Sequence, residues 1–474
     1  MKSALLTLLF SLSPALLCAG PADTKIKELA ALPGVRNASW GLSVKDSSGR
    51  TVAALNPRLN LTPASILKVL PAAAALDKFG PGKAFPTGLY YDGKVSNGFL
   101  NGNLYIKGAG DPSLGSQLLA GAVPLEEVFR GWAGALKAAG VKVINGAVLG
   151  DETAFESVQP GSWAWEDIGN YYAAQPSALT VNDGLYKLYF KPAAAAGGEA
   201  AVLRTEPYVE GLEFENYMRT GAPGSGDNGY IFAFPGQYRA VLRGTVPQGP
   251  AEFAINGALP DPALFAAQSL GRYLAKAGIN ANKKPGKGAT PPGAALLAEA
   301  PAVPLGEVVR LTNKRSFNLY AELLLRQLGG GKPGAGAAAV RDFLAGAGVE
   351  VSELKLADAC GLSWRNMVKA ETFTDLLLAL RAKPYFADFE ASLVFPGDPD
   401  ATGHVRNLGK GTPLEKSLRL KSGSLNGVRS YTGYLKTKKG RTLAFTSILN
   451  NYSMPGSASD KMHEDLLLAL YNSY

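Results

Sequence analysis

Histidine and cysteine are scarce in this chain, whose 474 residues contain two of each. A zinc centre built on histidines is therefore not expected, and the one His-Glu pair, His463-Glu464, lacks the second histidine that a zinc peptidase helix requires. Two cysteines also exclude a fold held together by several disulfides. We predict neither a metal nor any other cofactor for this protein.

Long apolar runs are also lacking, since no segment after the N-terminus reaches the length of about 18 apolar residues that indicates a membrane-spanning helix. At the N-terminus, Lys2 precedes an apolar stretch over residues 4–17, and small residues follow it, as in a secretory signal peptide. We assign residues 1–22 to this signal, with cleavage after Ala19 or Ala22. The chain is thus predicted to be exported, with no integral membrane segment after signal removal.

Charged residues are few, at 18% of the chain, and basic ones outnumber acidic ones by 48 to 39. Losing Lys2 leaves 47 basic residues against 39 acidic ones, so the net charge falls from +9 to +8. A basic excess on an exported protein favours an anionic polymer or surface such as cell wall as its partner, although solubility alone explains it equally well. The basic residues are scattered and no aromatic-basic motif accompanies them, so we predict no nucleic-acid partner.

The two ends of the chain share a mixture of helices and strands that the middle lacks. Two strands are predicted over residues 40–56 and a helix from Pro63, while the C-terminal part has a strand pair over 427–449 and an amphipathic helix over 459–471. Between about 86 and 299 the sequence shows short strands, glycine turns and two helices. We therefore predict that the middle is an insertion into a fold formed by the two ends.

A Ser-x-x-Lys pattern, Ser65-Ile66-Leu67-Lys68, lies in the helix predicted from Pro63. Residues three apart share a helix face, so the Lys68 amine can reach the Ser65 hydroxyl and, when neutral, take its proton. A second match, from Ser352 to Lys355, lies in a predicted strand. Its two side chains would point to opposite faces there, and we reject it as a site.

Two further patterns provide polar groups. Ser316-Phe317-Asn318 stands at the start of a predicted helix, and Lys421-Ser422-Gly423-Ser424 lies in an extended stretch just before a strand. A glycine in that stretch lets backbone and ligand approach closely, and a lysine with a serine hydroxyl can hold an anion. Ser-x-Asn is common by chance, as a second match at 424–426 shows, whereas Lys421 begins the one Lys-[Ser/Thr]-Gly of the chain.

The order of these three patterns in an exported protein resembles that of the penicilloyl serine transferases, which include penicillin-binding proteins and class A β-lactamases. Ser316 follows Ser65 by 251 positions, too many for a compact β-lactamase. The chain is therefore similar to the class C low-molecular-mass penicillin-binding proteins, the D-alanyl-D-alanine carboxypeptidase/endopeptidase family. Similar stretches run over nearly the whole mature chain, at residues 100–105, 108–112, 150–155, 261–265, 320–322, 358–363 and 427–434.

The resemblance implies an α/β (α+β) fold. It comprises a β-lactamase/transpeptidase-like domain, in which helices flank an antiparallel sheet, and a large β-rich insertion that forms two further domains. The expected boundaries are 23–85 and 300–474 for the catalytic domain, 86–165 and 258–299 for inserted domain II, and 166–257 for inserted domain III. The resemblance also implies the periplasm or cell-wall space of a bacterium, peptidoglycan stem peptides as substrates, and β-lactam antibiotics as acylating ligands.

The resemblance further implies a serine-type D-Ala-D-Ala carboxypeptidase, with possible endopeptidase action on cross-links. Ser65 would attack the carbonyl of the penultimate D-Ala, with neutral Lys68 as the base. Ser316 would relay a proton to the leaving amine, supported electrostatically by Lys421. Backbone N–H groups of Ser65 and Ser424 would form the oxyanion hole.

The remaining residues of the implied site bind substrate. Asn318 would contact the substrate amide, and Ser422, next to Gly423, would help hold the terminal carboxylate. Asp151 would hold the free amine on the side chain of the substrate's diamino acid, although Gly150-Asp151 equally suits a turn after a strand.

The chain departs from the family pattern at four positions, with Phe317 in place of Asp, Ser422 in place of Thr, Cys360 in place of Ser and Trp364 in place of Arg. Two other functions fit the same motifs. A β-lactamase would hydrolyse its acyl-enzyme quickly, and a non-catalytic penicillin sensor would be acylated without releasing D-Ala from a peptide.

Overall fold

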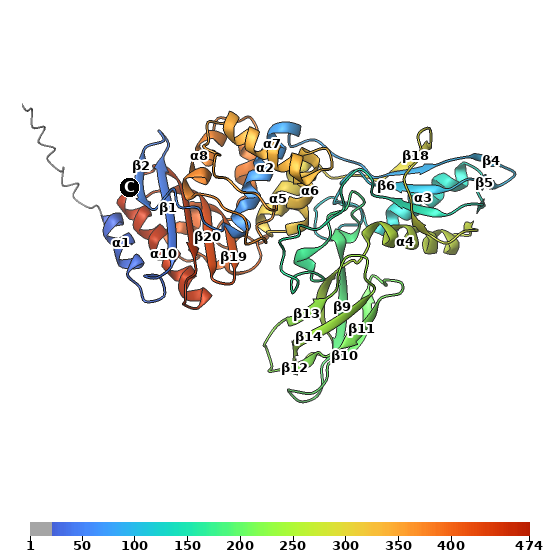
Figure 1. The fold of residues 1–474 in the computed structure, drawn as a ribbon, viewed down its shortest axis with the longest axis horizontal. Coiled ribbons are helices and arrows are strands. Elements are labelled where there is room, and N and C mark those ends of the chain that lie inside the picture. The colour runs from blue at the N-terminus through green and yellow to red at the C-terminus, as the bar shows by residue number, and fades with distance from the viewer. Residues whose placement is uncertain (1–20) are drawn as a thin grey trace, which may run out of the picture.

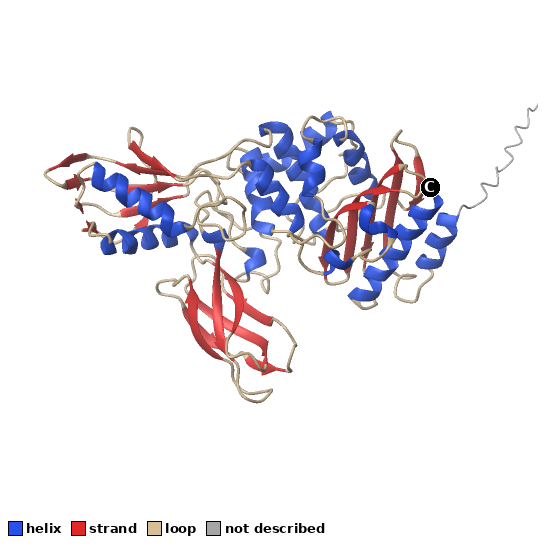
Figure 2. Cartoon of the chain, turned by 180° about the vertical axis from the view of Figure 1, so that it is seen from behind, coloured by secondary structure: helices blue, strands red, loops and turns tan. Residues whose placement is uncertain are grey.

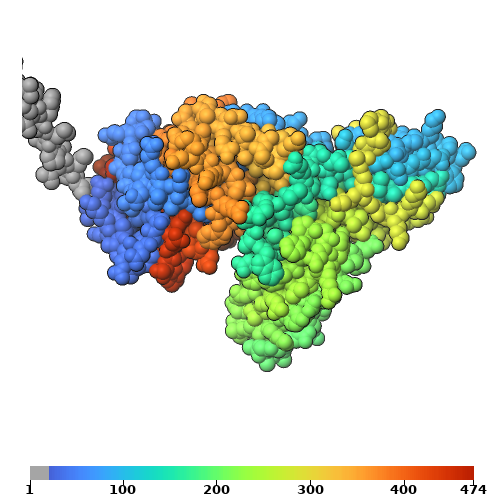
Figure 3. All heavy atoms as spheres, viewed as in Figure 1, coloured from blue at the N-terminus to red at the C-terminus, as the bar shows by residue number. Residues whose placement is uncertain are grey.

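The structure is a computed structural model that describes residues 21–474, so the predicted signal peptide lies outside the described residues except for Pro21 and Ala22. Figure 1 shows a domain that contains both ends of the described chain, here called the core domain, and two inserted parts that project from it. In the space-filling view of Figure 3, one inserted part continues the long axis of the molecule and the other points downward. The domain boundaries given above stay a prediction.

The core domain is built on a five-stranded antiparallel sheet with the strand order β19-β20-β21-β1-β2. The C-terminal strands therefore pair with the N-terminal ones, and β21 lies between β20 and β1. The strands are β1 (Ser39–Asp46), β2 (Thr51–Leu55), β19 (Leu418–Leu425), β20 (Val428–Lys436) and β21 (Thr442–Asn450).

Helices cover both faces of this sheet, as Figure 2 shows. Alternate residues of β21 face different cores: Phe445 and Leu449 join the core under α1 and α10, whereas Ala444 and Ile448 join the core that contains α2, α6 and α8. This arrangement explains why the central strands are apolar on both faces. The helices of the core domain are α1 (Pro21–Ala30), α2 (Val69–Phe79), α5 (Leu305–Lys314), α6 (Asn318–Leu328), α7 (Pro333–Gly346), α8 (Ala370–Leu380), α9 (Phe386–Ser392) and α10 (Gly456–Ser473).

Inserted domain II consists of small sheets with two helices packed against them, α3 (Leu125–Ala138) and α4 (Pro262–Lys276). One sheet has the order β17-β8-β6-β3-β18 and the other β16-β7-β5-β4. The strands are β3 (Gly88–Tyr91), β4 (Lys94–Ser96), β5 (Phe99–Asn101), β6 (Leu104–Lys107), β7 (Val143–Ile144), β8 (Val148–Asp151), β16 (Asn280–Ala281), β17 (Gly286–Lys287) and β18 (Ala295–Glu299).

Inserted domain III contains strands of two sheets, with the orders β10-β9-β15 and β11-β14-β12, and β13 pairs with β14. The strands are β9 (Leu185–Lys191), β10 (Ala201–Glu206), β11 (Glu213–Asn216), β12 (Arg219–Gly221), β13 (Asn228–Phe232), β14 (Arg239–Pro247) and β15 (Phe253–Ala258).

The predicted fold class, a mixed α/β protein with a transpeptidase-like sheet and a β-rich insertion, is confirmed. One detail differs, because the helix expected from Pro63 begins as a 3₁₀ turn over Ala64–Lys68 and becomes α-helical only from Val69. Within residues 21–474, no helix is both long enough and apolar enough to span a bilayer.

His463 on α10 anchors this helix to the sheet through buried hydrogen bonds. Its Nδ1–H donates to the Ser459 carbonyl (2.8 Å), and its Nε2 accepts from the Ser447 hydroxyl (3.0 Å), which in turn accepts from the Trp40 indole N–H (2.8 Å). These partners assign the tautomer. Burial lowers the pKa of His463 to about 4, because the charged imidazolium would lose its hydration.

Protonation of His463 should therefore destabilise the fold. The unfolded chain takes up this proton below about pH 6.5, whereas the folded chain takes it up only near pH 4, so stability is lost as the pH falls through this window. The loss due to His463 amounts to about 3 kcal/mol at pH 4. In urea unfolding at pH 7 and pH 4, His463→Gln should lose less stability between the two pH values than the wild type does. Equal losses in both proteins would contradict this assignment.

Candidate active site

The three sequence patterns meet at one cavity, which residues of the core domain and of the insertion line together. The 3₁₀ turn before α2 carries Ser65 and Lys68, the connection between α5 and α6 carries Ser316, and the edge strand β19 carries Lys421. The cavity has a volume of about 340 Å³. Its lining residues are Ser65, Asp167, Tyr171, Tyr172, Arg315, Ser316, Phe317, Asn318, Gly361, Leu362, Ser424 and Leu425.

Each of the two lysines contacts one of the two serines. The Lys68 Nζ donates to Ser65 Oγ at 2.8 Å, and the Lys421 Nζ donates to Ser316 Oγ at 2.9 Å. The second partner of each ammonium group is a backbone carbonyl, that of Cys360 for Lys68 (2.5 Å) and that of Ser422 for Lys421 (2.6 Å). The structure therefore places a basic nitrogen within proton-transfer distance of both hydroxyl groups.

Both lysines are fully buried, and this burial changes their acidity. Burial lowers the pKa of Lys68 to about 8, although the nearby Asp358 and Glu322 carboxylates counteract the effect. The pKa of Lys421 lies well below its usual value because of burial and because of repulsion from the Lys68 charge. Loss of one proton from this pair is thus much easier than for lysines in water.

Two non-glycine residues of the site adopt left-handed backbone conformations, Ala64 (φ 50°) directly before Ser65, and Ser316 (φ 57°). Such conformations cost of order 1–3 kcal/mol each and persist only where packing holds them. Gly361 provides part of this packing, because a Cβ on it would lie 2.0 Å from the Ala64 carbonyl oxygen. Gly423 of β19 also lies close to Ser65, since a Cβ added to Gly423 would lie 2.9 Å from the Ser65 backbone nitrogen. The geometry of Ser65 thus depends on two glycines of distant segments.

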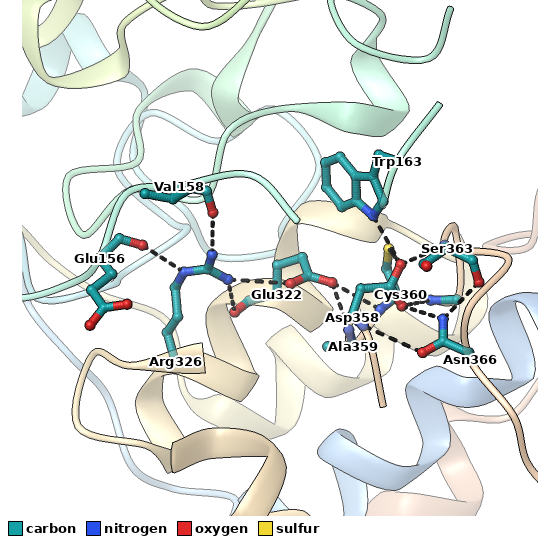
Figure 4. Close-up of polar contacts among 11 residues, drawn as sticks. Glu156, Val158, Trp163, Glu322, Arg326, Asp358, Ala359, Cys360, Ser363 and Asn366 are labelled. Carbon is teal, nitrogen blue, oxygen red and sulfur yellow. Dashed lines mark hydrogen bonds and ion pairs between the residues drawn. The ribbon is translucent and has the colours of Figure 1, made fainter. Parts of the chain in front are cut away.

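A buried network behind the site fixes the loop over residues 358–363 (Figure 4). One Glu322 oxygen accepts from the backbone nitrogens of Ala359 (2.7 Å) and Cys360 (3.0 Å), and the other forms an ion pair with Arg326 (3.2 Å). Glu322 thereby fixes the backbone at Ala359 and Cys360, and with it the Cys360 carbonyl that accepts a hydrogen bond from Lys68.

Asp358 accepts hydrogen bonds both from the same loop and from Trp163 of the insertion. One of its oxygens accepts from Gly361 N and Asn366 Nδ2, both at 2.8 Å, and the other accepts from Ser363 N (2.7 Å) and the Trp163 indole N–H (2.9 Å). The ligand atoms of Glu322, Asp358 and Cys360 lie within 4.8 Å of one another, a spacing that suits a metal ion. Because all four carboxylate oxygens already accept hydrogen bonds, we interpret the cluster as a structural network.

The structure does not bring Asp151 to the cavity. One of its carboxylate oxygens accepts from Thr153 N (2.9 Å) and Thr153 Oγ1 (2.6 Å), and the other accepts from Thr290 N (2.8 Å). Asp151 is buried and does not line the cavity. These contacts agree with the second interpretation of Asp151, a turn residue at the end of β8, and its contact with a substrate amine stays a prediction.

The other predicted residues lie at the cavity or next to it. Ser424 lines it, Ser422 and Gly423 precede Ser424 on β19, and Asn318 lines it while its Nδ2 donates to the Tyr172 carbonyl at 2.7 Å. The rejected serine, Ser352, donates its hydroxyl hydrogen to Glu350 instead of contacting a lysine.

Sequence reasoning missed the contribution of the insertion to the site. Asp167, Tyr171 and Tyr172 line the cavity, yet no motif marks them, and the contact between Asn318 and Tyr172 spans 146 positions. Glu322 and Asp358 could have been identified from the sequence, because both stand in stretches that resemble the family.

Comparisons with known proteins agree with this site. The family described as D-Ala-D-Ala carboxypeptidase 3 (S13) matches residues 22–470. A D-alanyl-D-alanine carboxypeptidase of Actinomadura sp. (strain R39) is 30% identical over 441 residues, which cover 89% of this chain and 80% of the relative. The D-alanyl-D-alanine carboxypeptidase DacB of Haemophilus influenzae is 26% identical over 429 residues, which cover 86% of this chain and 84% of the relative.

The fold is also found in a solved structure. The crystal structure of penicillin binding protein 4 (dacB) from Haemophilus influenzae superposes with a TM-score of 0.79 at 24% identity and covers 94% of this chain and 98% of that protein. These findings confirm the resemblance to the class C low-molecular-mass penicillin-binding proteins. Because the family match spans nearly the whole described chain, the protein belongs to the D-Ala-D-Ala carboxypeptidase 3 (S13) family.

Proposed function

We propose that Ser65 is the nucleophile with which this serine-type D-Ala-D-Ala carboxypeptidase cleaves peptidoglycan stem peptides. The observation that carries the proposal is the distance of 2.8 Å between Lys68 Nζ and Ser65 Oγ, at a cavity that also presents Ser316 and Asn318. A serine hydroxyl is a weak nucleophile until an adjacent base accepts its proton, and a buried lysine with a lowered pKa is such a base.

In the acylation step, Ser65 Oγ forms a bond to the carbonyl carbon of the penultimate D-Ala while Lys68 takes its proton. The negative charge on the carbonyl oxygen is stabilised by the backbone N–H groups of Ser65 and Ser424. Ser316 then passes its proton to the leaving nitrogen, the proton that Lys68 took from Ser65 replaces it, the C–N bond breaks, and D-Ala departs. Water finally hydrolyses the ester on Ser65 and restores the enzyme.

Two further residues orient the peptide. The Nδ2 of Asn318 is held by the Tyr172 carbonyl, so its Oδ1 remains available to accept from a substrate amide N–H. Ser422 follows Lys421 on β19 and is assigned to the terminal carboxylate.

The charges around the two lysines give that carboxylate a second role. Glu322 and Asp358 raise the pKa of Lys68, whereas burial and the charge of Lys68 lower that of Lys421, so we place the shared proton on Lys68 before substrate binds. A substrate carboxylate beside Lys421 reverses this preference, because it stabilises the charge on Lys421. Substrate binding thereby frees Lys68 to act as the base.

Family membership favours the carboxypeptidase over the two alternatives, a β-lactamase and a non-catalytic sensor. A Haemophilus influenzae relative has been solved in complex with a β-lactam, which supports the proposal that β-lactams acylate Ser65 here as well. We further propose that the chain is exported and works in the periplasm or cell-wall space. Release of D-Ala from a stem pentapeptide, with slow steady-state turnover of nitrocefin, distinguishes the carboxypeptidase from both alternatives.

Replacement of the nucleophile tests the assignment of Ser65. Ser65→Ala should abolish labelling by fluorescent penicillin and lower D-Ala release by about 10⁴-fold or more, as loss of a serine nucleophile does in other enzymes. Ser352→Ala is the matched control, since it removes the serine of the second Ser-x-x-Lys pattern and should leave both measurements unchanged. Retained labelling of Ser65→Ala, or loss of labelling in Ser352→Ala, would refute the assignment.

A pentapeptide with a C-terminal carboxamide tests the role of the substrate carboxylate. Without that carboxylate, the proton stays on Lys68, so acylation should require deprotonation near pH 8 and its rate should rise with pH through that value. The natural peptide should reach its full acylation rate at a lower pH. Stopped-flow measurement of acylation over pH 5–9.5 gives both profiles, and coincident profiles would show that the carboxylate does not control the base.

A further inference from the structure

The turn Asn182-Asp183-Gly184, directly before β9 of inserted domain III, contacts the start of α6. All three residues have a positive φ, at 50°, 58° and 70°. Consecutive non-glycine residues in this conformation are unfavourable and persist only where their surroundings hold them. The turn approaches α6 so closely that a Cβ on Gly184 would lie 2.8 Å from the Leu319 side chain. A strained turn of the insertion thus packs against the helix that follows Ser316.

Asp183 connects this turn with two other segments of the chain. Its Oδ1 accepts from the hydroxyl groups of Ser116 and Tyr320, both at 2.5 Å, and its Oδ2 accepts from the Gln117 backbone nitrogen (3.0 Å). Ser116 and Gln117 precede α3 of inserted domain II, whereas Tyr320 lies in the first turn of α6. The carboxylate is buried, and both of its oxygens are occupied. Asp183 therefore joins both inserted domains to the core domain.

Tyr320 connects this buried carboxylate to the segment that carries Ser316. Phe317 directly follows Ser316, and its ring packs edge-on against the Tyr320 ring at a centroid distance of 4.8 Å. Phe317 occupies the N-cap position of α6 but has no polar side-chain group that could cap the helix. The first turn of α6 is attached to the insertion instead, because Asn318 donates to the Tyr172 carbonyl (2.7 Å) and Tyr320 donates to the buried carboxylate.

The Tyr320 hydroxyl remains a hydrogen-bond donor at neutral pH. Burial, together with the charge of Asp183, holds the pKa of Tyr320 well above its usual value. Burial also raises the pKa of Asp183, although its hydrogen bonds and the nearby charge of Arg315 counteract the effect. Arg315 directly precedes Ser316, so Asp183 interacts with groups on both sides of this serine, whose own backbone is left-handed (φ 57°).

We propose that Asp183 is a positioning residue for Ser316: through Tyr320 and Phe317, it fixes the left-handed conformation from which the Ser316 hydroxyl protonates the leaving nitrogen. The inference rests on the proposed function, because it concerns the proton relay assigned to Ser316. Asp183 does not line the catalytic cavity and acts only through its neighbours. A general acid accelerates a reaction by about 10²–10⁴-fold, provided that it lies within hydrogen-bond reach of the leaving atom. Loss of the contact should therefore slow the departure of leaving groups that need a proton.

Two substrates with the same acyl part distinguish positioning from a general loss of structure. In a stem pentapeptide, the leaving group is the amine of D-Ala, which needs a proton to depart. In the matching thiolester, D-thiolactate replaces the terminal D-Ala and keeps its carboxylate. Thiols have a pKa of about 8.5, so the thiolate departs without a proton. A variant that merely folds less well loses kcat/KM equally on both substrates, so the ratio of the two values reports the proton relay.

Tyr320→Phe removes only the hydroxyl that donates to Asp183. We expect kcat/KM for the pentapeptide to fall about 10-fold and that for the thiolester to change less than about twofold. The matched control is Tyr434→Phe on β20, since Tyr434 is also buried and donates to the Leu377 carbonyl of α8 (2.6 Å); it should leave the ratio unchanged. Asp183→Ala should change the ratio at least as much as Tyr320→Phe, and the double variant no more than Asp183→Ala, because both act through one contact. If Asp183→Ala does not fold, Tyr320→Phe alone decides.

Ser316→Ala separates this inference from the proposed function. It should change the ratio at least as much as Tyr320→Phe, and adding Tyr320→Phe to it should change the ratio no further. Equal losses on both substrates in Ser316→Ala would refute the relay role of Ser316 and the positioning role with it. If Ser316→Ala behaves as expected, an unchanged ratio in Tyr320→Phe, or an equal change in Tyr434→Phe, would overturn the proposal for Asp183 alone.

Discussion

Two lysines, Lys68 and Lys421, are buried at one site, and in the described chain neither ammonium group contacts a carboxylate. Burial of an ammonium group costs several kcal/mol unless it is compensated, and the proximity of two such groups adds repulsion. The groups that contact the two ammonium groups directly are two hydroxyls and two backbone carbonyls, and the Glu322 and Asp358 carboxylates stabilise the Lys68 charge without contacting it. The site therefore exists only if the 3₁₀ turn, the connection between α5 and α6, β19 and the loop over 358–363 hold their relative positions closely.

The rest of the core domain provides this rigidity. The sheet places β19 at its edge, where β20 pairs with it on one side and Val394 bridges to Leu420 on the other, and the end of β19 with Ser424 and Leu425 lines the cavity. Glu322 on α6 and Asp358 together fix the loop whose carbonyl accepts from Lys68, and Trp163 extends the same network into the insertion. The insertion is therefore part of the site, because Tyr172 orients Asn318 and Asp167, Tyr171 and Tyr172 line the cavity.

The sequence was sufficient to predict the fold class and to find the residues that meet at the cavity. Ser65, Lys68, Ser316 and Lys421 were identified because each stands in a short motif with a defined local geometry. The role of Asp151 could not be predicted in the same way, because Gly150-Asp151 occurs equally in turns and a local pattern carries no information about distance from the cavity. The role of Tyr172 depends on a contact between segments far apart in the chain, which local periodicity does not encode.

The most direct test of this mechanism is a titration of the two lysines by NMR. In protein with ¹³Cε-labelled lysine, Lys68→Arg and Lys421→Arg identify the two signals. We predict that one lysine of the pair loses its proton at or below about pH 8, well before the surface lysines, which titrate near about pH 10.4. Titration of both buried lysines together with the surface lysines would contradict the proposal that burial turns one of them into the base for Ser65.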